Sequence, residues 1–205
     1  MRIINARVSD DLKSGKALRL SLGAGGADPD GRYCVDLLEL PGIDIVADLN
    51  RPLDQLPDNC ATEIVTSHTL EHVQNFMPLM AEIHRIVAPG GRISIVVPHF
   101  SSGLAYSDPT HVRFFGLYSM HYFADSADQP ATRSVPNFYS PIRFRVERAD
   151  IVFYDWGTFV QRWFGKFMTR FWNKSMKRRH FYESRLAYFY PADELHYVLT
   201  PVKSA

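Results

Sequence analysis

A short apolar segment that runs directly into a cluster of glycines is the strongest constraint on how this chain folds. Residues 18–22 alternate apolar and polar side chains, which predicts a short strand. Gly23-Ala24-Gly25-Gly26 follows at once, and its missing Cβ atoms let the backbone turn sharply and let a flat ligand approach. A second predicted strand, Arg32–Val35, ends on Asp36. A carboxylate beside such a turn can accept two hydrogen bonds from a ribose diol, so the segment predicts a site for a nucleotide-like cofactor.

Two classes of cofactor use this arrangement of glycines and acid. A dinucleotide site needs a third glycine and a helix whose N-terminus receives the pyrophosphate. Here Asp28 stands in the place of the third glycine, and about ten residues separate Gly26 from Asp36, too few for a crossover of roughly a dozen. The segment therefore favours a cofactor with a ribose and no pyrophosphate, such as S-adenosylmethionine (SAM). A glycine turn that binds no ligand stays open as the alternative.

The rest of the chain alternates short apolar strands with one clear helix. Asp48 follows the third apolar run, so a second acidic side chain ends a strand near the glycines. This order predicts an α/β fold with a Rossmann-like, mostly parallel sheet and an antiparallel last strand. The expected strands beyond the first two are 43–47, 61–66, 92–97, 144–153 and 194–202, and the expected helix is 76–87, which Pro89-Gly90-Gly91 ends.

We expect residues 1–205 to form a single domain with two insertions. Residues 99–142 are expected to form a long loop with a short helix near 115–123, and loops of this length in compact domains are usually functional. Residues 154–190 form the second insertion. Together the insertions are expected to build the acceptor site or a lid. Residues 1–16 give no clear structural prediction.

A long amphipathic helix is predicted at 156–177, within the second insertion. Its apolar positions are mostly Trp and Phe, and its opposite face carries Arg and Lys. Such a helix packs on the sheet, packs on a second copy of the chain as a homodimer contact, or attaches peripherally to an anionic membrane surface. The sequence leaves these alternatives open.

Composition narrows the compartment and the partners. The formal net charge of +1 gives no global attraction to nucleic acid. Cys34 and Cys60 are too few for a disulfide framework and predict free thiols in a reducing compartment. The sequence offers no signal-peptide pattern and no apolar run of membrane-spanning length. We therefore expect a cytoplasmic protein, with the inner face of the membrane as an alternative location.

Several segments resemble class I SAM-dependent methyltransferases, in particular the broad type 11 family. The most specific is Ile83–Ile93, a helix that closes on Val-Ala-Pro-Gly-Gly before a strand. Residues 98–102 and 108–115 resemble a subgroup found beside enzymes of polysaccharide biosynthesis. The resemblance covers about residues 18–100 and implies transfer of a methyl group from SAM. The other matching segments are Leu20–Gly26, Val35-Asp36, Val46–Leu49 and Thr66–His72.

The resemblance implies a role at the cofactor for each matched residue. Gly23 and Gly25 would line the methionine and ribose, Asp36 would hold the ribose hydroxyls, and Asp48 would accept from the adenine amino group. Leu49 would lie against the adenine ring, with Ser67 and His68 beside the methionine and the sulfonium. The full predicted cofactor-binding set is Leu22, Gly23, Ala24, Gly25, Asp36, Leu37, Asp48, Leu49, Ser67 and His68.

Three histidines are the candidate catalytic bases: His72, His99 and His111. Methyl transfer is an in-line displacement at the sulfonium carbon, so it needs alignment first and a base only when the acceptor is a hydroxyl. An imidazole can take that proton near neutral pH. We therefore expect a small-molecule or glycan acceptor that is methylated at oxygen.

Residues 68–72 also spell His-x-x-Glu-His, a pattern of zinc peptidases. Zinc binding by this motif requires both histidines on one helix face, whereas His68 ends a predicted strand. We therefore predict no metal.

Two functions of other classes stay open. One is a methyltransferase-like binding module without catalysis, which would act through the aromatic and basic helix. The other is an NAD(P)-dependent oxidoreductase, which Asp28 and the missing crossover helix disfavour.

Overall fold

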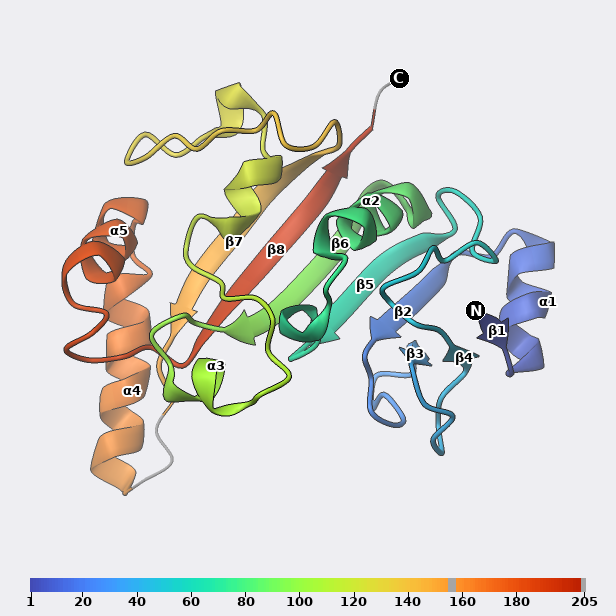
Figure 1. The fold of residues 1–205 in the computed structure, drawn as a ribbon, viewed down its shortest axis with the longest axis horizontal. Helices are drawn as coiled ribbons and strands as arrows, with labels where there is room; N and C mark the ends of the chain where they lie inside the picture. Colours follow the sequence, from blue (N-terminus) through green and yellow to red (C-terminus); the bar gives the residue numbers. More distant parts are fainter. Residues whose placement is uncertain (155–157, 204–205) are drawn as a thin grey trace.

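The computed structural model describes residues 1–154 and 158–203, and its centre is a twisted eight-stranded sheet in the order β1-β4-β3-β2-β5-β6-β8-β7 (Figure 1). The strands from β4 to β6 in this order pair in parallel, whereas the pairs β1–β4, β6–β8 and β8–β7 are antiparallel. The predicted mostly parallel α/β sheet with an antiparallel last strand is therefore confirmed. The strands are β1 (Arg2–Ile3), β2 (Leu18–Leu22), β3 (Tyr33–Asp36), β4 (Ile45–Val46), β5 (Ala61–Ser67), β6 (Val87–Pro98), β7 (Arg143–Val152) and β8 (Glu194–Val202).

The position of β2 in the sheet determines where a ligand can bind. From β2 the chain adds β3 and β4 on one side, and it then returns to the other side to add β5 and β6. In open α/β sheets, ligands bind outside the carboxyl ends of the strands where the strand order reverses in this way. Here that place is the carboxyl end of β2 and β5, at the lower edge of the sheet in Figure 1.

Helices lie on the sheet and beyond its two edge strands. The predicted central helix is α2, and its residues Leu79, Met80 and Ile83 are buried against the sheet. Among residues 1–154 and 158–203 no helix is both long enough and apolar enough to cross a membrane. The helices are α1 (Ala6–Ser14), α2 (Phe76–Ile86), α3 (Gly103–Ser107), α4 (Phe159–Trp172) and α5 (Met176–Arg185), with short 3-10 helices η1 (Leu70–His72), η2 (Ser119–Phe123) and η3 (Ser126–Asp128).

Most predicted strands are confirmed, with local differences. The strand at Leu18–Leu22 is found with the predicted bounds, and no helix forms between β2 and β3. The strand predicted at 43–47 is limited to Ile45–Val46. The glycines of Pro89-Gly90-Gly91 do not separate the helix from β6, because β6 already begins at Val87 and bulges across these residues. Residues 1–16, for which the sequence gave no prediction, contain β1 and α1.

The single helix predicted at 156–177 is wrong, because the segment forms two helices with a break after Trp172. The helical backbone is interrupted at Ser175, which is extended (φ −159, ψ 155). Just before it, the side chain of Asn173 accepts from the backbone N–H of Ile151 at 2.9 Å and donates to the carbonyl of Ile151 at 2.6 Å. Ser175 then begins α5, since its side chain accepts from the N–H of Arg178. The predicted position Trp156 lies outside the described residues.

The apolar face of α4 is largely solvent-exposed in the monomer. Phe159, Val160 and Trp163 are 84%, 70% and 61% exposed, so this part of the apolar stripe does not pack on the sheet, which was one of the alternatives that the sequence left open. The C-terminal part of the helix, including Met168 and Trp172, packs against the core. In Figure 1, α4 lies at the far end of the molecule, beyond the edge strand β7.

We predict that Asn173→Ala destabilises the fold by about 1–3 kcal/mol, because it removes both side-chain partners of a backbone unit on the edge strand. Urea unfolding measures this change in the free energy of unfolding. The neighbouring exposed Lys174→Ala is the control and should change it by less than about 0.5 kcal/mol. Equal stabilities for the two variants would contradict the role of Asn173.

Candidate functional site

A cavity of about 290 Å³ lies at the carboxyl ends of the parallel strands, where the sheet order reverses. Its walls come from the glycine turn after β2, from the ends of β3 and β4, and from the segment after β5. The lining residues are Gly23, Asp36, Leu37, Ala47, Asp48, Leu49, Asn50, His68, Thr69, His72 and Val73.

The glycine turn has a backbone that only glycine fits. Gly23 has φ +66, and a Cβ placed on it would overlap with the side chain of Thr69. The N–H groups of Gly23 and Ala24 donate to the carbonyl of Val35 at 2.8 and 3.3 Å. The turn after β2 is therefore fixed against both β3 and the segment after β5.

Asp36 is held by the turn that it faces. Its Oδ2 accepts from the N–H of Gly25 at 2.9 Å, and its Oδ1 accepts from the N–H of Leu38 at 3.1 Å. Each carboxylate oxygen can accept a further hydrogen bond. The side chain is thus pre-oriented in the cavity wall with free acceptor capacity.

Asp48 is oriented in a similar way on the opposite wall. Its Oδ1 accepts from the backbone and side-chain N–H groups of Asn50 at 2.9 and 3.2 Å. The side-chain oxygen of Asn50 in turn accepts from the backbone N–H of Asn75 at 3.0 Å, and the backbone carbonyl of Asn50 accepts from Asn75 Nδ2 at 2.8 Å. This network connects the end of β4 to the start of α2.

Six of the ten predicted cofactor residues line this cavity: Gly23, Asp36, Leu37, Asp48, Leu49 and His68. The other four do not line it. Leu22 is buried in the core, and Gly25 donates to the lining residue Asp36. Ala24 and Ser67 each adjoin a lining residue in the sequence. Sequence analysis missed Thr69 and Asn50, whose positions depend on contacts with Gly23 and Asp48.

Asp28 lies in a cluster of charged side chains after the glycine turn. Nη1 of Arg32 is 3.1 Å from Asp28 Oδ1, but the same guanidinium also pairs with Asp30 at 2.7 Å and with Glu63 at 3.1 Å, so it does not neutralise Asp28. The missing helix between β2 and β3 is confirmed. The absence of a helix N-terminus at this turn, together with the negative charge of Asp28, therefore disfavours a pyrophosphate.

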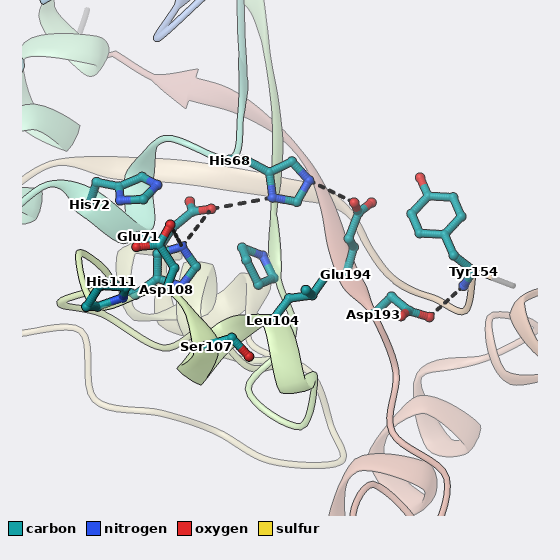
Figure 2. A pocket seen from close by; sticks show the side chains of 12 residues that line it. His68, Glu71, His72, Leu104, Ser107, Asp108, His111, Tyr154, Asp193 and Glu194 are labelled. Carbon is teal, nitrogen blue, oxygen red and sulfur yellow. Dashed lines mark hydrogen bonds and ion pairs between the residues drawn. The ribbon is translucent and has the colours of Figure 1, made fainter. Parts of the chain in front are cut away.

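A second cavity of about 490 Å³ adjoins the first, and His68 and His72 line both. Figure 2 shows its side chains, which come from the segment after β5, from α3 and the loop after it, and from the start of β8. The remaining lining residues are Glu71, Pro98, Leu104, Ser107, Asp108, Pro109, His111, Tyr154, Asp193 and Glu194.

His68 lies between two carboxylates at the junction of the cavities (Figure 2). Its Nε2 is 2.8 Å from Glu194 Oε1, and its Nδ1 is 3.5 Å from Glu71 Oε1. The hydrogen bond to Glu194, followed by the contact with Glu71, raises the pKa of His68 to about 10. Burial opposes ionisation of Glu194, but hydrogen bonds with His196, His68 and Tyr154 outweigh it and lower the pKa of Glu194 to about 2. At neutral pH His68 is therefore a cation paired with Glu194.

Glu194 was missed by sequence analysis, although one signal could have located it. It is the first residue of β8, and it pairs with Pro98, the last residue of β6. Because β8 runs antiparallel to β6, it begins at the edge of the sheet where β6 ends. The first side chains of β8 therefore lie at the carboxyl ends of the parallel strands.

Two of the three predicted catalytic histidines line the second cavity. The rings of His72 and His111 are 4.7 Å apart between centroids, at an interplanar angle of 68°. His72 Nδ1 is 2.8 Å from Thr110 Oγ1, and His111 Nδ1 is 3.0 Å from the carbonyl of Ala105. Both contacts are made by Nδ1, so they leave Nε2 of each ring available for other partners.

His99 is placed differently from the prediction. It follows the end of β6, but its side chain is fully buried and lines neither cavity. Its Nδ1 contacts Ser101 Oγ at 2.7 Å and its Nε2 contacts Glu183 Oε2 at 3.3 Å. These contacts give His99 a role in fixing the loop after β6, with no access to a substrate.

We predict that the His68–Glu194 pair stabilises the fold most between pH 4.5 and 6.5. The raised pKa of His68 gives stability that is complete below the ordinary value of 6.5 and is lost as the pH rises through about 10. The lowered pKa of Glu194 gives stability that is complete above 4.5 and is lost as the pH falls through about 2.

Urea unfolding of the wild type and of Glu194→Gln at a series of pH values measures this effect. The difference in the free energy of unfolding should be largest in that window and should shrink steadily towards pH 10. Glu147→Gln, at an exposed position of β7, is the control. A difference that does not change with pH would rule out the pair as its source.

Comparisons with known proteins agree with this geometry. Residues 33–95 match the family model described as "Methyltransferase domain". A search of curated proteins gave no match.

Two solved structures cover nearly the whole chain. The YcgJ protein from Bacillus subtilis is 14% identical with a TM-score of 0.51, over 98% of this chain and 99% of that chain. A chain from the complex between the Haloferax volcanii Trm112 methyltransferase activator and a putative methyltransferase is 11% identical with a TM-score of 0.51, over 99% and 100% of the two chains. These likenesses show a shared fold.

Proposed function

We propose that this chain is a class I SAM-dependent methyltransferase with SAM as its cofactor, and that it methylates a hydroxyl of a small-molecule or glycan acceptor. One observation carries the proposal: the two adjoining cavities share His68 and His72 in their walls. A cofactor in the first cavity and an acceptor in the second would meet at these residues. This arrangement provides the alignment that an in-line displacement needs.

The first cavity suits the parts of SAM in a definite order. Asp36 has free acceptor capacity for the two ribose hydroxyls, and Asp48 on the opposite wall can accept from the adenine amino group. Leu37 and Leu49 supply apolar surface for the ring. The cationic His68 is better suited to the carboxylate of the methionine than to its sulfonium, because like charges repel.

The second cavity suits an uncharged acceptor that carries several hydroxyls. Four of its lining residues are carboxylates: Glu71, Asp108, Asp193 and Glu194. Carboxylates accept hydrogen bonds from hydroxyl groups and repel anions, so a sugar or a small polyol fits this lining better than a phosphorylated acceptor does.

His72 and His111 are the proposed bases for the acceptor hydroxyl. In the neutral ring, a proton on Nδ1 leaves the Nε2 lone pair available to take the hydroxyl proton. As the oxygen–methyl bond forms, the methyl–sulfur bond breaks and its electron pair returns to sulfur, which leaves as a neutral thioether. His99 is not part of this proposal, because its ring is buried behind the cavity wall.

The two alternative functions are an NAD(P)-dependent oxidoreductase and a non-catalytic binding module. The missing helix between β2 and β3 continues to disfavour an NAD(P)-dependent oxidoreductase. A non-catalytic module stays possible as an outcome of the binding test below. A place in polysaccharide biosynthesis and a cytoplasmic location remain predictions from sequence.

The sequence alternatives of membrane contact and a homodimer contact for α4 can be tested directly, because aromatic side chains of this helix are exposed. Phe159, Trp163 and Phe167 are 84%, 61% and 47% exposed on one helix. Sedimentation with anionic lipid vesicles tests peripheral membrane contact, and the molecular mass in solution tests a homodimer. A monomer that stays in the supernatant would contradict both alternatives.

We predict that Asp36→Ala weakens SAM binding by about 1.5–3 kcal/mol, roughly 10- to 150-fold, because it removes a charged acceptor for the ribose hydroxyls. Calorimetric titration with SAM, S-adenosylhomocysteine and NAD measures the affinities, and the two adenosyl ligands should bind while NAD does not. The exposed Asp54→Ala is the matched control. If no adenosyl ligand binds to the wild type, the non-catalytic module is favoured instead.

We predict that His111→Gln lowers the rate of methyl transfer by about 10²- to 10⁴-fold through loss of a base. The SAM affinity should be unchanged, because His111 lines the second cavity and not the first. A screen of sugars and polyols with methyl-labelled SAM provides the assay. His84→Gln, on α2 and bonded to the carbonyl of Val202, is the control. An unaltered rate in His111→Gln would remove this residue from the mechanism.

A further inference from the structure

Glu71, His72 and His111 come together in the wall of the second cavity (Figure 2). Each contributes one potential ligand atom, and these atoms all lie within 4.8 Å of one another. Glu71 and His72 belong to η1, whereas His111 belongs to a loop about forty residues later in the chain. The N–H of Val112 donates to the carbonyl of Glu71 at 2.9 Å, which fixes this loop beside η1.

The hydrogen bonds of both rings determine which nitrogen is free. The hydroxyl of Thr110 donates to Asp108 Oδ1 at 2.6 Å, so Thr110 must accept from His72 Nδ1–H at 2.8 Å. A backbone carbonyl only accepts, so His111 donates its Nδ1–H to Ala105. In both neutral rings Nε2 therefore carries a lone pair and no proton. This is the state in which histidine binds a metal ion, with the other ring nitrogen bonded to an oxygen that orients the ring.

Glu71 is the unusual member of the cluster. Its side chain is 1% exposed, and among residues 1–154 and 158–203 no donor is hydrogen-bonded to either carboxylate oxygen. Its nearest cationic neighbour is His68, at 3.5 Å, and Glu194 already pairs with that histidine at 2.8 Å. Burial of a carboxylate without hydrogen bonds is costly, so a further partner for Glu71 would stabilise this arrangement.

We propose that Glu71, His72 and His111 bind a divalent transition-metal ion of the Zn²⁺ type in the wall of the acceptor cavity. Two imidazoles and one carboxylate form the ligand set of catalytic zinc sites that keep a position open for water or substrate. Imidazole ligands favour Zn²⁺, Fe²⁺ or Ni²⁺ over Mg²⁺, which prefers oxygen ligands. The open positions of the ion would take oxygen atoms of the acceptor.

The ligands must move together when the ion binds. Bonds of about 2.1 Å around a tetrahedral ion place ligand atoms about 3.4 Å apart, and the atoms are spread over 4.8 Å without it. A metal site here differs from the sequence prediction of no metal. It also differs from the zinc-peptidase geometry, in which both histidines of the motif bind the ion. His68 is not a ligand in this site, and the third ligand comes from His111. The inference concerns ion binding and does not depend on which acceptor is methylated.

The experiment is a titration of the full chain, freed of metal by a chelator, with Zn²⁺ by calorimetry and with Co²⁺ by visible absorption. The wild type should bind one ion per chain, and Co²⁺ should give the d–d absorption of a site with nitrogen and oxygen ligands. Glu71→Gln and His111→Ala should each weaken binding by at least about 100-fold, more than the effect of losing a ring-orienting contact. Thr110→Val, which removes the acceptor for His72 Nδ1–H, should weaken it by about 10- to 100-fold.

Two controls keep the proposal open to refutation. His84→Gln removes a histidine outside the cluster and should leave zinc affinity unchanged. Circular dichroism and SAM titration of Glu71→Gln, in which the amide has the same shape as the carboxyl group, show whether the variant is folded. If the wild type binds no zinc, or if the folded Glu71→Gln and His111→Ala bind it as tightly as the wild type, the proposal is wrong. Loss of zinc binding with retained SAM binding supports it and leaves the cofactor site untouched.

Discussion

The close approach of Gly23 and Thr69 is the constraint on which the rest of the site depends. A side chain at residue 23 would overlap with Thr69, so the turn after β2 can touch the segment after β5 only because a glycine stands there. The same turn donates to Val35 and, through Gly25, to Asp36. The turn thus contacts the end of β3 and the segment after β5 at the same time. The two cavities meet at this place because His68 and His72 flank Thr69 in the chain.

Charge differentiates the two cavities that share this wall. The second cavity contains four carboxylates, and His68 is the cation that balances part of their charge. Because Glu194 anchors His68 from one side and Glu71 lies on the other, the positive charge stays at the junction of the cavities. The lining of this cavity therefore combines carboxylates and histidines, with the positive charge of His68 held at the junction with the first cavity.

The parallel half of the sheet could be predicted from sequence because its signals are local. Apolar runs bounded by glycine, proline or acidic residues mark β2, β3 and β5, and acids at strand ends mark Asp36 and Asp48. Features that depend on distant contacts could not be predicted. The break after α4 lies where the Asn173 side chain bonds to Ile151 and Ser175 is extended, and no helical periodicity reveals either feature. His99 follows a strand end as the prediction required, but contacts with Ser101 and Glu183 turn its ring into the core.

Glu194 illustrates the same limit at the site, whereas His111 was predicted as a candidate base although its place in the cavity also depends on a distant contact. Each reaches the cavity through a tertiary pairing: Glu194 through the register of β8 with β6, and His111 through the bond between Val112 and Glu71. That second bond has a consequence for the chemistry. It places an imidazole whose Nδ1 is already bonded next to a buried carboxylate, so the lone pair of Nε2 is kept available whether it receives a proton or binds an ion. The same ring contacts that would make His111 a base would make it a ligand, and occupancy by a metal would decide between these roles. With an ion bound, the acidity of the acceptor hydroxyl would come from the metal, and the cavity would need no free histidine base.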